Sequence, residues 1–390
     1  FSTAIAREAG VPLPRDAKMT DAPCHSWILP TLLAHAGIEF LHIGCNAASS
    51  SPEVPMFFTW KGVDGSSVQT CYSASGYGSD LVPPAGWAPP EWLAVIHTGD
   101  NQGPPPADNV AALSERARKE MPETNVKFGR LSDFSDLVRA DQSPLFNQTV
   151  RGDMPDTWIH GIMAMPIESG LARTTRPRIF ALEALHTLMG MWGAAAPGPV
   201  DDIVAHAYER SLRFGEHTFG MDGKRFDVFH YGPDWAEKRA KGEYARLEES
   251  WREKGDSIRE TARAIGAPLA AHLDALAAAT AVEGKRWTVY NPLTWTRSGL
   301  VEMAASAAPA ALRDLRDGTT VPVEPSGGGF RFVAKDVPAL GYATFAAADA
   351  TPGAPEALRS DAGAGMLENE WFRIQADAAR GAIVSFVDKT

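Results

Sequence analysis

The sequence has few cysteines, no long apolar run and no cluster of basic residues. Its three cysteines, at positions 24, 45 and 71, form no Cys-x-x-Cys pair, so neither a disulfide framework nor a cysteine-rich zinc site is predicted. The odd count is typical of a reducing compartment and slightly favours a cytoplasmic location. No run of about 18 apolar residues occurs, so no transmembrane helix and no membrane partner are predicted. A formal net charge of −11 without a basic run also argues against a nucleic acid partner.

The sequence shows no signal peptide either, and it begins with Phe1 rather than Met. At its other end, a strand-like run is followed directly by the last residue, Thr390. A final β domain with so few strands would leave open sheet edges and a small core. We therefore expect this chain to be a fragment cut at both ends, with any targeting segment upstream of it.

Length and composition indicate a multidomain globular protein. A chain of 390 residues is too long for one ordinary core and predicts two or three domains. Hydrophobic residues make up 44% of the chain and charged residues 22%, which is ordinary for globular proteins. Eleven tryptophans are a high count, and although most are expected in cores or between domains, their faces also suit stacking on sugar rings.

The spacing of apolar residues divides the chain into three regions. Residues 1–145 alternate short apolar runs with helical spacing, which is typical of β/α units. Residues 146–283 have mainly helical spacing and predict a helix bundle, whereas residues 284–390 alternate as strands do. The predicted fold class is therefore multidomain: α/β, then α, then β.

Turn residues and apolar runs also predict the individual elements. Asp64-Gly65 between two apolar runs predicts a β-hairpin over residues 56–72. The other strands expected in the first region are one ending at residues 20–21 and strands at 39–43, 92–97 and 126–129, with helices over 27–36, over 107–120 and from residue 132. Later helices are expected over 173–192, 200–214 and 236–281, and later strands at 287–290, 300–303, 330–333 and 342–345.

Two aspartates follow predicted strands, at the position where α/β enzymes collect catalytic groups. Asp21 lies between a strand and a helix, and its structural interpretation is an N-cap of that helix. Asp100 follows the apolar run 92–97 in a segment rich in Gly and Pro, and its structural interpretation is a turn residue. Two strand ends that each carry a carboxylate are a stronger signal than either alone.

A third candidate lies in the helical region. His217 stands in the sequence Phe-Gly-Glu-His-Thr-Phe-Gly, at the end of a predicted helix. A lone histidine is more often structural than a ligand. Its neighbour Glu216 is either a surface carboxylate or an acceptor that orients the imidazole.

These segments resemble glycoside hydrolase family 38, the retaining class II α-mannosidases. The spacing of Asp21, His25 and Ser26 is similar to the family's nucleophile motif, and the segment around Asp100 resembles its Gly-rich acid/base loop. The Glu-His-Thr run at His217 resembles its zinc-ligand segment. Residues 152–161, 290–298, 367–374 and 381–389 resemble later blocks of the family, in the family's order.

The resemblance implies a fold and a set of roles. Residues 1–145 would be the C-terminal portion of a β/α-barrel-like catalytic domain, 146–283 a three-helix-bundle middle domain and 284–390 an incomplete β-sandwich. Asp21 would be the nucleophile and a Zn²⁺ ligand, Asp100 the general acid/base and His217 a second zinc ligand. Trp158 would contact the carbohydrate substrate. His25 and Glu216 would not bind the metal themselves but would position the side chains that do.

The sequence also departs from the family pattern. Pro23 and Cys24 stand where an aromatic residue and a glycine are expected, which suggests a divergent, bacterial-type branch. The family's other two zinc ligands come from an upstream His-x-Asp motif that this chain does not contain. Because a catalytic zinc site needs about three protein ligands, we expect this chain alone to bind zinc poorly.

Two other functions remain open from the sequence. One is a zinc-dependent carbohydrate deacetylase on a related barrel, and the other is a non-catalytic carbohydrate-binding homologue whose site has decayed. A covalent glycosyl adduct on Asp21 would exclude the first, whereas the presence of His-x-Asp in an upstream segment would argue against the second.

Overall fold

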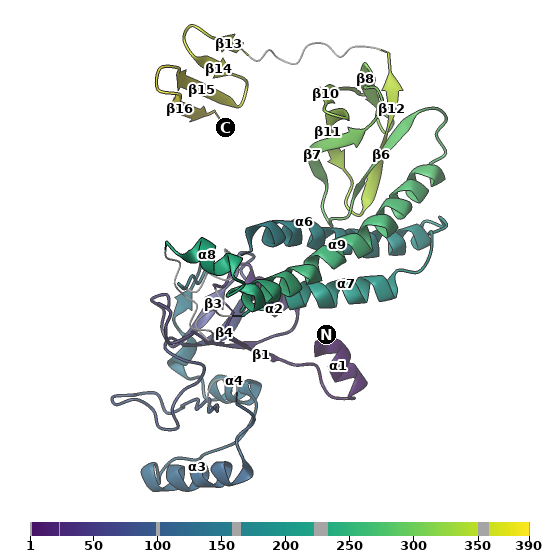
Figure 1. Ribbon diagram of the computed structural model, residues 1–390. Helices are drawn as coiled ribbons and strands as arrows, with labels where there is room; N and C mark the ends of the chain where they lie inside the picture. Colours follow the sequence, from purple (N-terminus) through teal and green to yellow (C-terminus); the bar gives the residue numbers. More distant parts are fainter. Residues whose placement is uncertain are drawn as a thin grey trace. The chain divides into compact units, whose positions relative to one another are not determined.

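The computed structural model describes residues 2–22, 24–98, 102–157, 165–221, 233–349 and 359–389 (Figure 1). The chain divides into two compact units: unit 1 comprises Phe1–Ser169 and Gly215–Lys254, and unit 2 comprises Gly170–Phe214 and Gly255–Thr390. Both helices and strands occur in the chain, in keeping with the predicted mixed composition. Across the described ranges, no helix combines the length and apolar character needed to cross a membrane.

Unit 1 is built on a five-stranded mixed sheet of order β1-β2-β4-β3-β5. Its strands are β1 (Asp16–Thr20), β2 (Phe40–Gly44), β3 (Phe57–Lys61), β4 (Ser67–Ser73) and β5 (Thr149–Val150). β1, β2 and β4 are parallel, and their last residues, Thr20, Gly44 and Ser73, lie level with one another. Polar residues that follow these strands are therefore brought to one edge of the sheet.

The hairpin predicted from Asp64-Gly65 is confirmed. β3 and β4 pair antiparallel, and Gly65 in their turn has φ +89°, a conformation that glycine adopts without strain. The Asp64 carboxylate accepts hydrogen bonds from Thr31 Oγ1 at 2.8 Å and from the Ser66 backbone N–H at 3.0 Å. The turn is thereby tied to α2 (Leu29–His35).

Helices cover both faces of this sheet. On β2, Leu41 and Ile43 point into a cluster that includes Leu29 and Leu33 of α2. Phe40 points to the other face, where it packs against Phe134 of α4 (Leu131–Ala140) in an edge-on aromatic contact. All five residues of β2 are buried, as expected for a central strand covered on both sides.

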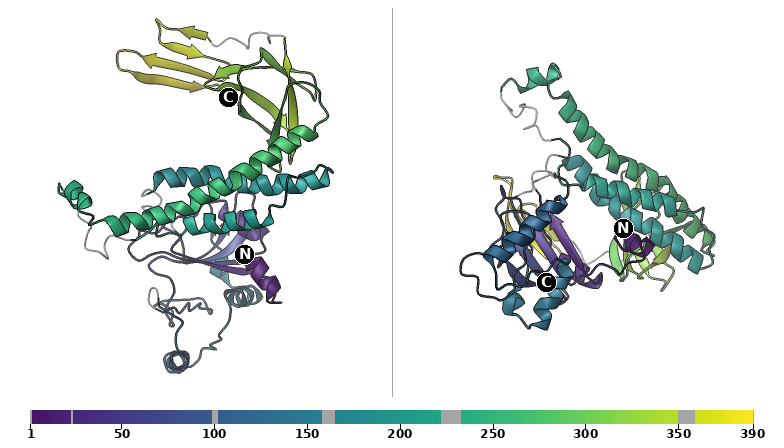
Figure 2. Two further views of the ribbon diagram at one scale, coloured as in Figure 1. Left: turned by 45° about the vertical axis from the view of Figure 1, so that its right-hand side comes forward. Right: turned by 90° about the horizontal axis from the view of Figure 1, so that it is seen from below.

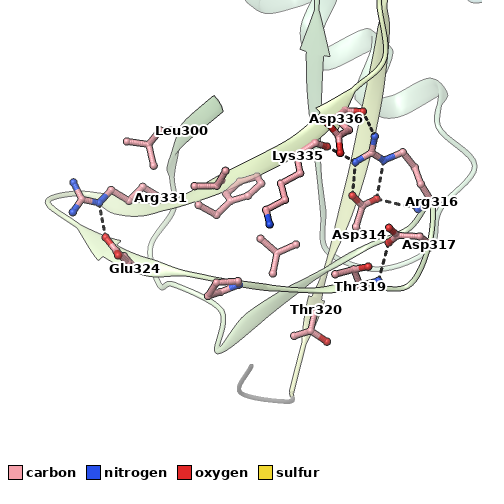
Figure 3. Close-up of a pocket in the computed structure, with 14 residues that line it drawn as sticks. Leu300, Asp314, Arg316, Asp317, Thr319, Thr320, Glu324, Arg331, Lys335 and Asp336 are labelled. Carbon is pink, nitrogen blue, oxygen red and sulfur yellow. Dashed lines mark hydrogen bonds and ion pairs between the residues drawn. The ribbon is translucent and has the colours of Figure 1, made fainter. Parts of the chain in front are cut away.

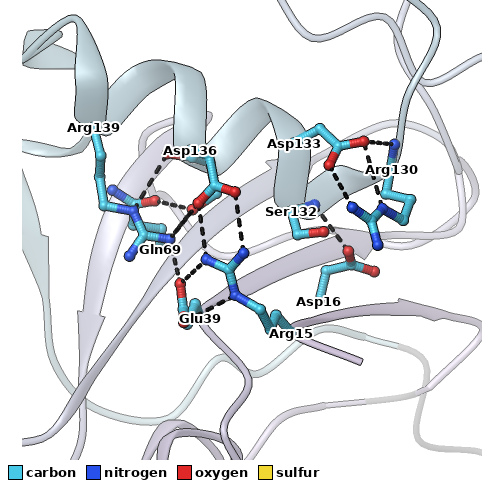
Figure 4. A network of polar contacts seen from close by, with 10 residues as sticks. Arg15, Asp16, Glu39, Gln69, Arg130, Ser132, Asp133, Asp136 and Arg139 are labelled. Atoms are coloured by element: carbon cyan, nitrogen blue, oxygen red, sulfur yellow. Dashed lines mark hydrogen bonds and ion pairs between the residues drawn. The ribbon is translucent and has the colours of Figure 1, made fainter. Parts of the chain in front are cut away.

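An ion-pair network joins α4 to the beginning of the sheet (Figure 4). Arg15 donates to Glu39 at 2.7 Å and to Asp136 of α4 at 2.8 Å, and Arg139 of α4 also pairs with Glu39. The pKa of Glu39 falls to about 2, because hydrogen bonds from Arg15 and then Arg139 outweigh the opposing effect of burial. The network fixes α4 beside the start of β1 and β2.

Two strands predicted for this unit are wrong. Residues 92–97 form no strand, and the Ser79 side chain occupies two of their polar groups: Ser79 Oγ donates to Leu93 O at 2.6 Å and accepts from Val95 N at 2.8 Å. Residues 126–129 are also not a strand, and Phe128 is 69% exposed. The helix between them, α3 (Ala107–Glu120), is confirmed.

The helices of unit 2 share one core. The unit contains α7 (Asp201–Phe214) and most of α6 (Pro166–Met191) and α9 (Ala245–Ala279), which run side by side in Figures 1 and 2. Ile179 and Leu182 of α6 pack with Val204 of α7 and Ile265 of α9. The third predicted helix is interrupted, since α8 (Trp235–Ala240) ends before α9 begins. The other helical segments of the described residues, both in unit 1, are α1 (Ser2–Glu8) and η1 (Pro144–Phe146).

Two further sheets of unit 2 enclose a second core. Their orders are β10-β11-β7 and β6-β12-β8-β9, and they enclose Trp287, Leu312, Phe330 and Phe345. These strands are β6 (Arg286–Asn291), β7 (Arg297–Ala304), β8 (Ala311–Asp314), β9 (Thr320–Pro322), β10 (Glu324–Ser326), β11 (Gly329–Val337) and β12 (Gly341–Ala348). A last sheet consists of β13 (Arg359–Asp361), β14 (Met366–Glu368), β15 (Phe372–Asp377) and β16 (Ala382–Asp388). The strands predicted in this region are confirmed.

Candidate active site

Asp21 directly follows β1, at the edge of the sheet where the parallel strands end. It is not an N-cap, because α2 begins at Leu29 and its N-cap residue is Ile28, which makes no side-chain capping bond. The backbone of Asp21 has φ +56°, in the left-handed region that few side chains adopt. Strained residues of this kind persist where the surrounding structure holds them, and they are common at functional sites.

The segment after Asp21 is held by residues 153–156. His25 and Met154 exchange backbone hydrogen bonds of 2.9 and 2.8 Å, and the Asp156 carboxylate accepts from the Cys24 N–H at 3.1 Å. Asp153 accepts from the Trp27 N–H at 2.7 Å. The backbone position of the motif thus depends on a segment far away in the sequence.

His217 lies beside Asp21, although the two residues are far apart in the chain. Its Nε2 atom is 3.6 Å from Asp21 Oδ2, and the two side chains are only 27% and 25% exposed. The other carboxylate oxygen, Asp21 Oδ1, is buried and has no hydrogen-bond partner among the residues that the structure describes. A buried carboxylate oxygen without a partner is costly, so its presence points to a site that receives a ligand.

Glu216 lies beside the His217 ring, and the orienting role predicted for it stays a prediction. Glu216 Oε1 lies 2.8 Å from His217 Nδ1, and Lys254 Nζ donates to Glu216 Oε2 at 2.9 Å. Burial tends to raise the pKa of Glu216, but hydrogen bonds from Thr218 and Lys254 lower it to about 2. Glu216 Oε1 can accept a hydrogen bond from His217 Nδ1, and Nε2 is then the ring nitrogen directed toward Asp21.

These two facing groups fit part of a zinc site. An imidazole nitrogen and a carboxylate oxygen that face each other can share a proton or a metal cation. Two tetrahedral zinc ligands at about 2.1 Å from the metal lie roughly 3.4 Å apart, close to the separation observed between Nε2 and Oδ2. The described residues nevertheless contain no cluster of three or more His, Cys, Asp or Glu side chains suited to a metal. Asp21 and His217 alone would offer a metal ion two ligands, and their role as zinc ligands stays a prediction.

Basic and hydroxyl side chains line the same edge of the sheet. Lys18 of β1 donates to Tyr77 O at 3.1 Å, and Asn46 donates to the Tyr77 hydroxyl at 2.8 Å. Burial lowers the pKa of Lys18, while the charge of Asp21 raises it. His42 of β2 is fully buried beside Ser73, and burial, helped by the charge of Lys18, lowers its pKa to about 4.

His25 occupies an unusual environment. It is 6% exposed, and neither of its ring nitrogens has a hydrogen-bond partner in the structure as described. Burial lowers the pKa of His25, and the nearby charge of Asp156 partly opposes this effect. The supporting role predicted for His25 stays a prediction, because its described contacts are to Met154 rather than to Asp21 or His217.

Three predicted positions lie outside the described residues: Asp100, Trp158 and Pro23. Sequence reasoning brought Asp21 and His217 together only through the family resemblance, and it missed Lys254 and Asp156. Lys254 lies in a helix dense in charged residues, so nothing in its surroundings distinguished it. The signal for Asp156 was available, since its segment was already matched to the family.

Comparison with known proteins rests on structure. No protein-family model and no curated protein sequence matches this chain. An α-mannosidase from Enterococcus faecalis V583 has a similar structure, with a TM-score of 0.51 and 12% identity over 98% of this chain and 48% of that one. A glycosyl hydrolase family 38 protein from Enterococcus faecalis gives 0.48 and 13%, over 98% and 46%. The first likeness shows a shared fold, and the chain spans about half the length of both structures.

Proposed function

We propose that this chain belongs to a glycoside hydrolase that cleaves α-glycosidic bonds, most similar to the retaining α-mannosidases. The observation that carries the proposal is the convergence of Asp21 and His217, whose Oδ2 and Nε2 atoms lie 3.6 Å apart, beside a buried and unpartnered Asp21 Oδ1. The shared fold with an α-mannosidase supports it. The substrate would be a carbohydrate, in which the sugar is most similar to mannose.

In this proposal Asp21 is the nucleophile. One of its carboxylate oxygens attacks the anomeric carbon, the bond to the leaving oxygen breaks, and Asp100 gives that oxygen a proton. Water then attacks the same carbon, Asp100 takes a proton from the water, and the Asp21 carboxylate is released. Two carboxyl groups about 5–5.5 Å apart suit this double displacement.

Asp21 and His217 are also the residues that would hold Zn²⁺. When bound, the ion would keep the nucleophile ionised and hold sugar hydroxyls. Glu216 and Lys254 would keep the His217 ring in place through their hydrogen bonds of 2.8 and 2.9 Å. The remaining ligands would come from an upstream segment, and Trp158 would contact the sugar.

The test is an Asp21→Asn variant of the whole protein, assayed on a panel of aryl α-glycosides. Loss of a nucleophile should reduce kcat by at least about 1,000-fold. Asp108→Asn, on an exposed turn of α3, is the matched control and should retain activity. Mass spectrometry with a fluorinated glycosyl donor should find a covalent sugar on Asp21. Full turnover by the Asp21→Asn variant would refute the proposal, and deacetylation without an adduct would favour the deacetylase alternative.

A further inference from the structure

A cavity of about 590 Å³ lies in unit 2, beside β11 (Figure 3). Its lining comes from β7, β8, β9, β10 and β11 and from the segment between β8 and β9. The volume falls within the range of small-molecule binding sites. None of the residues proposed for catalysis lines this cavity, so it would be a separate site.

The cavity exists because β11 is longer than its neighbour. β10 pairs with β11 only from Glu324↔Arg331 to Ser326↔Gly329, so the edge of β11 from Phe332 onward is not paired with β10. The segment between β8 and β9 lies beside the far end of that edge, where Arg316 reaches Lys335 and Asp336 (Figure 3). The cavity lies along this unpaired part of β11, which forms one of its sides.

Arg316 fixes the segment between β8 and β9 against β11. It donates to the backbone oxygens of Asp336 at 2.5 Å and of Lys335 at 2.6 Å, and it pairs with Asp314 at 2.5 Å. Asp314 is only 4% exposed, so its carboxylate is shielded from water and its pairing with Arg316 is strengthened. The cavity is therefore preformed, which lowers the entropic cost of binding a ligand.

Lys335 gives the cavity its chemical character. Its side chain extends into the space between β11 and the segment 319–324 (Figure 3). The two arginines of the lining are each paired with a carboxylate, Arg316 with Asp314 and Arg331 with Glu324 at 2.9 Å. Lys335 has no ion pair or side-chain hydrogen bond with any residue that the structure describes. Its ammonium is thus available to one anionic group.

The rest of the lining limits what that anion can be. Four carboxylates and three cations line the cavity, which gives a formal charge of −1 and disfavours polyanions. Leu300, Val321 and Val333 offer an apolar surface for the C–H face of a ring, while Thr320 and Asp317 offer polar atoms for hydroxyls. A ligand with one carboxylate, several hydroxyls and an apolar face matches all three features.

We propose that this cavity binds a saccharide unit that carries a single carboxylate, such as a uronic acid. The Lys335 ammonium would pair with the carboxylate, and the ring would lie against the apolar wall. Because the cavity shares no lining residue with the candidate active site, this proposal does not depend on glycosidase activity.

The experiment titrates the whole chain with methyl α-glucuronide and follows the methyl signals of Leu300, Val321 and Val333 by NMR. Methyl α-glucoside supplies the ring without the charge, and acetate supplies the charge without the ring. We expect saturable shifts with the glucuronide and an affinity at least about 10-fold weaker for either control compound, equivalent to about 1.4 kcal/mol.

Variants complete the test. Lys335→Met keeps the apolar stem and should weaken glucuronide binding at least about 10-fold, whereas Lys335→Arg should retain it. Lys119→Met, on exposed α3, is the matched control and should bind normally. Asp21→Asn should also bind normally, which separates this site from the proposed catalysis. Equal binding of the neutral glucoside or of acetate, or unchanged binding by Lys335→Met, would overturn the proposal.

Discussion

At Asp21 and Cys24 the backbone adopts a conformation that most side chains avoid. Their φ angles are +56° and +57°, and neither residue is glycine. A left-handed conformation costs a non-glycine residue roughly 1–2 kcal/mol. At Cys24 the cost is offset in part by Asp156, which accepts from the Cys24 N–H at 3.1 Å and whose own N–H lies 3.5 Å from the Cys24 sulfur. This left-handed backbone explains why a glycine is expected at position 24 in the nucleophile motif that the sequence resembles.

Substitution of Cys24 measures this strain directly. Cys24→Gly and Cys24→Ala both remove the thiol contacts with Asp156, but only glycine relieves the left-handed backbone. We expect the glycine variant to exceed the alanine variant in free energy of unfolding by about 1 kcal/mol. Urea denaturation at neutral pH measures both values. An alanine variant as stable as the glycine variant would show that φ at this position costs nothing.

Within elements, the central strand β2 carries a buried histidine. His42 is fully buried, and its pKa falls from 6.5 to about 4 through burial and the charges of Lys18 and His97. The folded state therefore holds this ring neutral, while the unfolded state protonates it below pH 6.5. Between about pH 4 and 6.5 the unfolded state binds more protons, so the free energy of unfolding rises with pH.

The His42→Gln variant tests the contribution of this strand to acid sensitivity. The wild type should lose up to about 1.4 kcal/mol of stability per pH unit from His42 as the pH falls from 6.5 to 4. His42→Gln should show a flatter profile over that window, even if it is less stable at pH 7. Denaturation midpoints at several pH values provide the measurement. His206→Gln, on the exposed face of α7, should keep the wild-type slope.

The register of β11 depends on a glycine. A Cβ atom on Gly329 would lie 1.9 Å from the backbone oxygen of Met303 on β7, a clash that only a backbone shift relieves. We expect Gly329→Ala to destabilise unit 2 by about 2 kcal/mol or more. Gly327→Ala is the control, because no atom lies within 4 Å of a Cβ built there. Similar unfolding midpoints for both variants would contradict this account of the register.

Local sequence signals predicted the helices and strands better than they predicted which strands pair. The Asp64-Gly65 turn and the helical spacing of residues 107–120 are local, and both predictions are confirmed. The apolar run at 92–97 looks like a strand, but the Ser79 side chain bonds to it where a neighbouring strand would. Pairing depends on residues distant in sequence, which apolar spacing does not report.

At the scale of the whole molecule, the candidate site could be predicted only in outline. Asp21 and His217 were found through a resemblance, and the structure places Oδ2 and Nε2 of these residues 3.6 Å apart. The side chains that hold them, Glu216 with Lys254 and the segment around Asp156, come from separate parts of the chain. These contacts form only when distant segments pack together, so no local sequence pattern predicts them.

The two-ligand set predicts how the chain responds to zinc. Asp21 and His217 alone should bind Zn²⁺ no more tightly than about 1 μM, since a catalytic site needs about three protein ligands. Isothermal titration of the 390-residue chain should show weak binding, and chelator should leave its melting temperature unchanged. His217→Ala should abolish even this binding, whereas His206→Ala should not. Stoichiometric, tight binding by this chain would contradict the prediction and would require further ligands within it.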